Sequence, residues 1–296
     1  MARPTRYPIV LCHGIAPFDV ALDALVRRFE PLFHDAEPVF DRIHYFKGIA
    51  GRLRREGYRV CKTRVSFAAG TVLRSRELKS QILEILARTA ADRVHIIGHS
   101  MGGLDARRMI AREGMADKIS TLTTIGTPHL GTPYAEWGIE RWWPCLRKTL
   151  GKVIRLEGFQ DLTPDACRKF NQALIASEIE NRVVYRTVSS QCDLYWVFAP
   201  LRRAWRIIYE QQGANDGLVP VSSQEWRSGL ENTIGTGKSI HRIRFPFPAD
   251  HLNQIGWWRC NGISLFRPTR ISPARYERAV RDFYVELVAG LAEFEP

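Results

Sequence analysis

The sequence lacks any apolar run close to the roughly 20 residues that a membrane-spanning helix needs. Its first apolar run, residues 9–12, is also shorter than the core of a secretory signal peptide, which takes roughly 7–15 apolar residues. These absences argue against an integral membrane protein. They favour a cytoplasmic protein over one that is exported without a leader or after its leader is removed.

The sequence also lacks closely spaced cysteines, because none of its six cysteines forms a CxxC pair. Structural zinc sites usually take thiolates from such pairs, so this distribution argues against a zinc site. No pairing into disulfides follows from the spacings. The six residues are Cys12, Cys61, Cys145, Cys167, Cys192 and Cys260.

The charge balance is strongly basic, with 43 lysines and arginines against 31 acidic residues and a formal net charge of +12. The basic residues are scattered. The short clusters at 52–55 and 202–206 have neither zinc-finger spacing nor the aromatic signature of RNA-binding modules, so we expect no nucleic-acid partner. The charge indicates a solvated basic surface or, where basic residues lie near apolar ones, attraction to an anionic lipid surface.

Apolar segments of strand length alternate with helical patterns along most of the chain. Helical spacing is clear in 78–86, in 104–110 and in 276–291. Such alternation predicts an α/β fold with a mostly parallel central sheet and helices on both faces, built as one domain over residues 1–296. The expected strands are 9–12, 58–65, 94–98, 120–125, 183–188 and 240–245.

Two segments interrupt this alternation. Residues 131–181 are helix-like and contain an aromatic cluster, and residues 195–209 are irregular, aromatic and basic. Because insertions between late strands of such a sheet often cover its carboxyl edge, we expect a helical cap or lid at 131–181 and a further cap-like stretch at 195–209. The aromatic residues either form a small core within the cap or line a substrate channel. They are Trp137, Trp142, Trp143 and Phe159.

The segment GHSMG, with Ser100 at its centre, has the GxSxG pattern of a nucleophile elbow. Five residues alone are a weak signal, but here an apolar strand precedes them and a helical pattern follows. A serine in this tight turn is exposed at the carboxyl edge of the sheet, and the flanking glycines allow strand and helix to approach closely. We expect Ser100 to be a nucleophile; the alternative is a glycine-rich turn with no chemistry.

An earlier strand ends in His13 and Gly14, where this architecture places part of an oxyanion hole. We expect the backbone N–H groups of Ile15 and Met101 to bind a developing oxyanion, with His13 and Gly14 supporting the loop. A His-Gly pair is common by itself, so this prediction depends on the GxSxG segment that follows it.

A serine hydroxyl needs a general base, and the base needs an acid that orients it. In this architecture the order along the chain is serine, acid, histidine. His251 lies in a loop after the last predicted strand and is the expected base, whereas His241 begins a strand and is expected to be structural. Asp216, in an Asn-Asp-Gly turn, is the favoured acid, and Asp193 is its rival. Asp250 is adjacent to His251 and therefore poorly placed to reach its ring.

Six segments of the chain, and the order in which they follow one another, resemble the true lipases of the α/β-hydrolase superfamily. The resemblance is greatest to the bacterial triacylglycerol lipases and their fungal-like relatives. The resemblance implies a triad of Ser100, Asp216 and His251, the oxyanion donors named above, and a lid after Thr127 that moves aside at a lipid surface. It implies hydrolysis of a lipid ester of long-chain fatty acids through an acyl-enzyme, with transient contact with a lipid interface. The segments are YPIVLCHGI, DRIHYFKGI, HIIGHSMGGLDAR, TTIGTPHLGTP, NDGLVP and DHLNQIGW.

Many bacterial members of this family hold a structural calcium partly through an aspartate two residues after the catalytic histidine, where this chain has Asn253. A neutral amide binds a hard cation less well than a carboxylate does. We therefore expect no bound calcium, although Asp193 could still be a ligand. No other cofactor is expected, because acyl transfer through a serine needs none.

Two other functions fit the same residues. The nearer one is another serine hydrolase on this scaffold, such as a short-chain carboxylesterase, a thioesterase or a polyester depolymerase, because the fold does not determine the substrate. The more distant one is a module that binds lipid surfaces and has lost the chemistry, although the presence of all three triad residue types argues against it. The sequence determines neither the acyl-chain length nor the oligomeric state.

Overall fold

The computed structural model describes residues 4–15, 45–66, 69–149, 157–227, 230–231, 237–257 and 272–296. Within this part of the chain, no helix is both long enough and apolar enough to span a bilayer. The four cysteines placed there have free thiols. The side chains of Trp142, Trp143, Cys145 and Cys260 lie outside the described residues.

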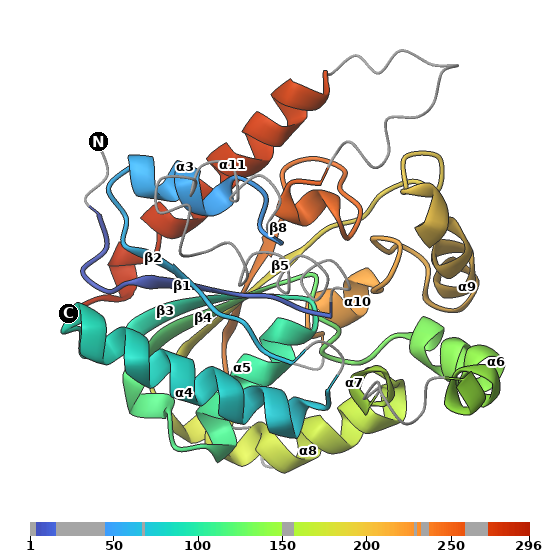
Figure 1. Ribbon diagram of the computed structural model, residues 1–296, viewed down its shortest axis with the longest axis horizontal. Coiled ribbons are helices and arrows are strands. Elements are labelled where there is room, and N and C mark those ends of the chain that lie inside the picture. The colour runs from blue at the N-terminus through green and yellow to red at the C-terminus, as the bar shows by residue number, and fades with distance from the viewer. Residues whose placement is uncertain are drawn as a thin grey trace.

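Six parallel strands form the central sheet, in the order β2-β1-β3-β4-β5-β8 (Figure 1). Each strand falls on one of the predicted strand segments, so the predicted parallel α/β architecture is confirmed. The strands are β1 (Ile9–Cys12), β2 (Val60–Lys62), β3 (Val94–His99), β4 (Ile119–Ile125), β5 (Val184–Ser189) and β8 (Ile240–Arg244).

Burial explains the sequences of these strands. Every residue of β1, β3 and β4 is buried, as expected for parallel strands covered on both faces, which are rich in apolar and β-branched residues. Strand β8 lies at the edge of the sheet and leaves Arg242 and Arg244 exposed. Charged side chains protect such an edge from pairing with another chain. A separate antiparallel hairpin of β6 (Leu230–Glu231) and β7 (Gly237–Lys238) has strands too short for the sequence pattern to indicate.

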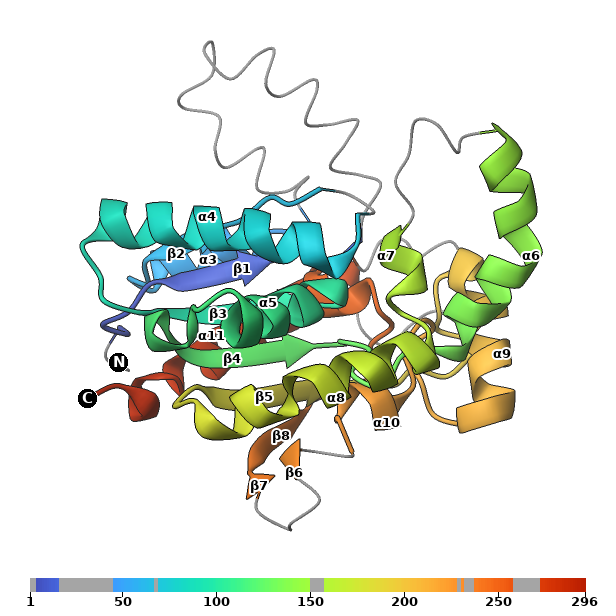
Figure 2. The same ribbon diagram turned by 90° about the horizontal axis from the view of Figure 1, so that it is seen from below.

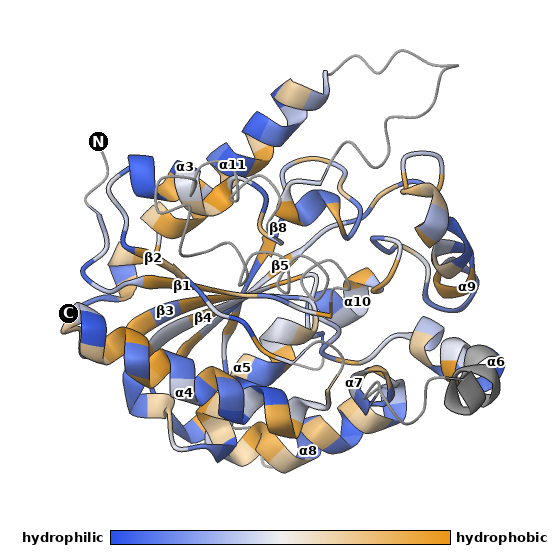
Figure 3. Ribbon diagram, viewed as in Figure 1, coloured by the Kyte–Doolittle hydropathy of each residue, from blue (hydrophilic) through white to orange (hydrophobic). Residues whose placement is uncertain are grey.

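Helices cover both faces of the sheet (Figure 1). Two clusters of buried side chains fill the spaces between helices and sheet. On one face, α3 (Ile49–Arg55) packs against α11 (Pro273–Ala289). On the other face, α4 (Thr71–Thr89) and α8 (Pro164–Glu180) flank α5 (Met101–Arg112). These helices carry hydrophobic and hydrophilic bands, as amphipathic helices do (Figure 3). Short 3₁₀ turns occur at η2 (Ala116–Lys118), η4 (Asn253–Ile255) and η6 (Ala292–Phe294).

Further helices lie beyond the carboxyl ends of the strands (Figure 2). Among them, α6 packs against α9, and the guanidinium of Arg203 lies 4.3 Å from the centre of the Trp137 ring. The segment 195–209, expected to be irregular, is largely helical. The helices beyond the carboxyl ends of the strands are α6 (Pro133–Thr149), α7 (Glu157–Gln160), η3 (Ala199–Leu201), α9 (Arg202–Gln212) and α10 (Val221–Gln224).

The predicted cap at 131–181 is too wide. Its last part, α8, covers a face of the sheet instead of its carboxyl edge. The physical reason is a fully buried ion pair, in which Arg107 of α5 donates to both carboxylate oxygens of Glu178 over 2.7 and 2.8 Å. Within the predicted range, the segments at the carboxyl edge are therefore α6 and α7.

Candidate active site

Ser100 lies in the turn between β3 and α5 and has a left-handed backbone, with φ 54° and ψ −131°. Residues other than glycine rarely adopt positive φ, and such strain persists only where the surrounding structure imposes it. Here the Ser100 N–H donates to the Ile125 carbonyl over 2.9 Å, and the Thr127 hydroxyl donates to the Ser100 carbonyl over 2.8 Å. The end of β4 and the residues just after it thus hold the turn that carries Ser100.

Two glycines bring other backbone segments close to this turn. A Cβ atom on Gly102 would lie 2.6 Å from the carbonyl oxygens of Cys12 and His13, at the end of β1. A Cβ atom on Gly14 would lie 2.7 Å from the Cβ of Ser100. Only glycine permits such close approaches without displacing the backbone. The loop after β1 therefore lies directly against the side chain of Ser100.

His251 and Asp216 form a buried hydrogen-bonded pair, with His251 Nδ1 2.8 Å from Asp216 Oδ2. The other carboxylate oxygen, Oδ1, accepts from the N–H groups of Leu218 and Val219 over 2.9 and 2.8 Å. The backbone N–H of His251 also donates to the Asp216 carbonyl over 2.8 Å. Main chain and side chain together therefore fix these two residues relative to each other.

The rival residues are placed differently. Asp193 is exposed, and the Nδ1 atom of His251 faces Asp216 instead. Asp250 is buried, and its Oδ1 accepts from the N–H groups of Leu252 and Asn253, which makes it a cap for the turn η4. His241 lies on the edge strand β8, away from this pair.

The structure brings the His251–Asp216 pair next to the turn of Ser100. The ring centres of His99 and His251 are 4.5 Å apart, so the His251 ring lies beside the residue that precedes Ser100. Among the described residues, no hydrogen bond joins Ser100 Oγ to His251 Nε2. Such catalytic hydrogen bonds are often long in unliganded enzymes and shorten when substrate binds.

Each predicted oxyanion donor belongs to a residue next to Ser100 in the chain or next to the glycine that lies against it. Met101 is the first residue of α5, where a helix leaves the N–H without an intrahelical acceptor. Ile15 follows Gly14, the glycine that lies against the Ser100 side chain. In the described part of the chain neither N–H donates to a protein acceptor, as the role of oxyanion donor requires.

Arg74 of α4, which the sequence reasoning missed, holds the loop after β1. Its side chain is fully buried and donates to the carbonyls of His13 and Gly14 over 3.0 and 3.3 Å. Asp105 of α5 pairs with it over 2.8 Å. Arg74 is four residues before Leu78, on the same buried face of α4, and a charged residue within an apolar stripe is the signal that the sequence offered.

Gln254 is a second missed residue, buried between the nucleophile turn and the acid. Its amide nitrogen donates to Asp216 Oδ2 over 2.8 Å and to Ser190 Oγ over 2.6 Å. Its amide oxygen accepts from His99 Nε2 over 3.0 Å, so the His99 proton is on Nε2. Gln254 follows His251 by three residues, a spacing that places both on one side of a helical turn and is its only signal in the sequence.

Burial keeps several histidines of this region neutral. Desolvation, reinforced by the Arg74 guanidinium, lowers the pKa of His13 to about 4. Desolvation and the neighbouring His251 ring lower the pKa of His99 well below its usual value. Desolvation also lowers the pKa of His129 far below its usual value. All three rings are therefore uncharged in the folded protein at neutral pH.

These shifts predict that the protein loses stability in mild acid. A histidine whose pKa is lower in the folded protein than in the unfolded chain stabilises the fold when the pH is above its pKa in the unfolded chain. This contribution is lost as the pH falls towards its pKa in the folded protein. For His13 the window runs from 6.5 down to about 4, and each such histidine contributes roughly 1 kcal/mol per pH unit. The free energy of unfolding in urea should fall between about pH 7 and about pH 5. The variant His13→Gln should show a smaller fall, and a constant free energy in the wild type would contradict the prediction.

The residues near Asn253 do not fit a calcium ion, which requires several carboxylate, carbonyl or water oxygens. The Asn253 side chain is buried, and its amide oxygen accepts from the Asp250 N–H over 3.3 Å, whereas Asp193 is exposed. Across the described ranges, no group of three or more histidine, cysteine or acidic side chains is arranged to hold a metal ion.

Known proteins of similar sequence and structure are lipases and esterases. The PGAP1-like alpha/beta domain matches residues 63–155. Triacylglycerol lipase 2 of Saccharomyces cerevisiae is 25% identical over 98% of this chain and 92% of the yeast protein. A triacylglycerol lipase of Vibrio cholerae is 33% identical, but that alignment covers 45% of this chain and 36% of the relative. A metagenomic carboxyl esterase shares the fold with a TM-score of 0.61 and 17% identity, over 97% of this chain and 77% of the esterase.

The parallel sheet, with a serine at the left-handed turn after its third strand along the chain, defines the class of the protein: it is an α/β-hydrolase. Within this class the chain is similar to triacylglycerol lipases, and the protein is a serine hydrolase of carboxylic esters. The family predicted from the six sequence segments is thus confirmed.

Proposed function

We propose that the protein hydrolyses acylglycerol esters of long-chain fatty acids through Ser100, with His251 as general base and Asp216 as the acid that orients it. The observation that carries this proposal is the 2.8 Å hydrogen bond between His251 and Asp216, beside a serine held at a left-handed strand-to-helix turn. The sequence relatives support the substrate class, because the yeast and Vibrio cholerae proteins are both named triacylglycerol lipases.

The reaction proceeds in two acyl-transfer steps. His251 removes the proton of Ser100 Oγ, and this oxygen attacks the ester carbonyl. The N–H groups of Ile15 and Met101 stabilise the resulting oxyanion. His251 then protonates the departing alcohol. Water activated by the same ring hydrolyses the acyl-enzyme and releases the fatty acid. Throughout, Asp216 keeps one imidazole proton on Nδ1 and stabilises the imidazolium that forms.

The carboxyl edge of the sheet carries the side chains that a lipid interface favours. Four exposed aromatic residues of the described chain lie on segments at this edge: Phe159, Tyr195, Trp196 and Tyr209. Arg203, on α9 with Tyr209, is exposed too. Tryptophan and tyrosine prefer the interface between lipid and water, and arginine is attracted to anionic head groups. We propose that this edge contacts the lipid surface during turnover.

The experiment that tests the proposed function compares p-nitrophenyl esters whose acyl chains run from about two to about sixteen carbons. We expect kcat/KM to rise with chain length over part of the series, because burial of each methylene contributes about 0.8 kcal/mol. Activity confined to short, soluble esters would make the protein a short-chain carboxylesterase. No activity on any ester, even with a lipid interface present, would contradict the hydrolase proposal.

We further propose that hydrolysis needs no calcium. Addition of EDTA should leave the rate on a soluble ester within about twofold of the untreated rate, because the residues around Asn253 offer no set of carboxylate ligands. The variant Asn253→Asp, assayed in parallel, shows whether a carboxylate at this position introduces sensitivity to EDTA. A loss of wild-type activity that calcium restores would contradict this proposal.

A further inference from the structure

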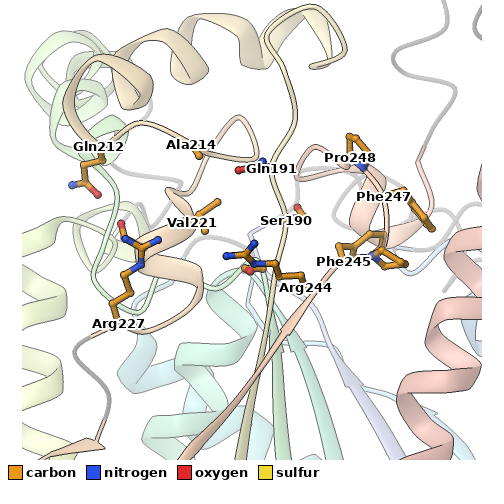
Figure 4. A pocket seen from close by; sticks show the side chains of 13 residues that line it. Ser190, Gln191, Gln212, Ala214, Val221, Arg227, Arg244, Phe245, Phe247 and Pro248 are labelled. Atoms are coloured by element: carbon orange, nitrogen blue, oxygen red, sulfur yellow. The ribbon is translucent and has the colours of Figure 1, made fainter.

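We propose that the protein has a second binding site, separate from Ser100, for a single-chain anionic amphiphile such as a fatty acid anion. The site is a cavity of about 450 Å³ between α10, the end of β5 and the loop after β8 (Figure 4). This volume lies within the range of small-ligand sites. Neither Ser100 nor His251 lines the cavity.

One side of the cavity is cationic. Figure 4 shows Arg227, which follows α10, and Arg244, the last residue of β8, on the same side of the cavity. Both are held by Glu225: Arg227 Nε lies 3.1 Å from Oε2, and Arg244 Nε lies 3.7 Å from Oε1. The arginine side chains are nevertheless 62% and 84% exposed. In the described part of the chain, their terminal N–H groups have no protein acceptor and can bind a ligand.

The chemistry of this side selects an oxyanion. Guanidinium groups bind carboxylates and phosphates through paired, charge-assisted hydrogen bonds. A third arginine, Arg242, donates to the carbonyls of Glu225 and Trp226 over 2.9 and 3.2 Å. Two arginines contact the Glu225 carboxylate and a third contacts its backbone carbonyl, so positive charges outnumber the one carboxylate and the local potential remains positive.

The other side of the cavity is apolar and rigid. In Figure 4, Phe245, Phe247 and Pro248 lie together at the end of the cavity away from Arg227, with Phe245 next to Arg244. The rings of Phe245 and Phe247 are 5.0 Å apart, and the Phe247 ring is 4.9 Å from that of Tyr276 on α11. An acyl chain whose head group is at the arginines can therefore lie along a preformed apolar wall. A ligand that satisfies both sides is amphiphilic and anionic.

The proposed reaction releases such a molecule, because ester hydrolysis produces a fatty acid anion at neutral pH. This identification of the ligand rests on the proposed function, whereas the existence of the site does not. The cavity also adjoins the network around the acid, since Ser190 of its lining accepts a hydrogen bond from Gln254, which donates to Asp216.

The test is equilibrium binding of decanoate, kept below its micellar concentration, to the wild type and to the double variant Arg227→Ala/Arg244→Ala. We expect the double variant to bind decanoate about tenfold more weakly or worse, because both charge-assisted contacts are lost. A matched control, Arg76→Ala/Arg168→Ala, removes two exposed, ion-paired arginines from helices on a face of the sheet and should bind decanoate as the wild type does. Decanoate held in the catalytic cleft would not depend on Arg227 and Arg244.

Two further ligands keep the test decisive even where a variant fails to fold. Decanol, with the same chain and no charge, should bind the wild type about tenfold more weakly than decanoate. Equal affinity for decanol and decanoate, or equal affinity of the wild type and the folded Arg227→Ala/Arg244→Ala variant for decanoate, would overturn the proposal. Decyl phosphate distinguishes the sources of the oxyanion. Equal affinities for decyl phosphate and decanoate support the fatty acid as the ligand. An affinity for decyl phosphate more than about tenfold above that for decanoate would assign the site to a phosphorylated lipid and overturn the fatty acid as its ligand.

Hydrolysis of p-nitrophenyl butyrate is measured on the same samples. We expect the double variant to keep the wild-type rate on this soluble ester, because neither arginine contacts the hydrogen-bonded pair of His251 and Asp216. Absence of hydrolysis by the wild type would contradict the proposed function, while decanoate binding that depends on the two arginines would still establish the second site.

Discussion

Replacing Ser100 with alanine is expected to lower kcat for p-nitrophenyl butyrate by on the order of 10⁴–10⁶-fold. In the proposed reaction the acyl intermediate forms on this hydroxyl, so its loss removes the covalent route. The backbone donors of Ile15 and Met101 stay in place and leave a small residual rate above that of the uncatalysed reaction. The measurement is nitrophenol release, together with labelling by a fluorophosphonate probe, which should modify the wild type and not Ser100→Ala.

The matched control for this variant is Ser80→Ala, which removes an exposed hydroxyl from α4 and should leave kcat unchanged. Alanine at position 100 must keep the left-handed backbone of the turn, so thermal unfolding of Ser100→Ala is compared with that of the wild type. A folded Ser100→Ala protein that retains more than about one per cent of wild-type kcat would show that another group is the nucleophile.

Replacing Asp216 with asparagine is expected to lower kcat by about 10⁴-fold, whereas Asp193→Asn should leave it within about twofold. An amide facing His251 Nδ1 can donate a hydrogen bond, which favours the tautomer whose Nε2 carries a proton and cannot accept one from Ser100. Asp193 is exposed and is not the partner of that nitrogen. The loss should appear in kcat at nearly constant KM, because the affected interaction strengthens in the transition state.

The two aspartate variants also separate catalysis from folding. An asparagine oxygen can keep the bonds that Asp216 Oδ1 accepts from the N–H groups of Leu218 and Val219, but its amide nitrogen cannot accept from the Gln254 amide at the Oδ2 position. We therefore expect Asp216→Asn to unfold at a somewhat lower temperature than the wild type and to remain folded at the assay temperature. If Asp193→Asn alone abolishes turnover, then Asp193 is the acid and the His251–Asp216 pair is structural.

Much of the fold could be predicted because its signals are local. Strands buried on both faces appear in the sequence as apolar runs, as β1 and β3 do, and all six strands of the sheet fall on segments predicted to be strands. The hairpin of β6 and β7 could not be predicted in this way, because two residues per strand form no periodic pattern.

The extent of the cap could not be derived from local patterns. Helix α8 has helical spacing like its neighbours, but its position depends on the buried pair of Glu178 and Arg107, which are 71 residues apart in the chain. Nothing in the sequence states that these two side chains meet. The cap was therefore expected to extend to residue 181, whereas the chain returns to the face of the sheet at α8.

By itself the sequence determined the strand segments of the sheet, the strand-to-helix turn at Ser100 and the position of His251 after the last strand, because each depends on neighbours within a few residues. Only the tertiary structure decided which aspartate reaches His251, and only it revealed that Arg74 and Gln254 hold the loop after β1 and the acid. The physical reason is that a buried polar group must find its hydrogen-bond partner wherever packing places one. Packing joins residues that are far apart in the chain, and no spacing along the sequence records those pairs.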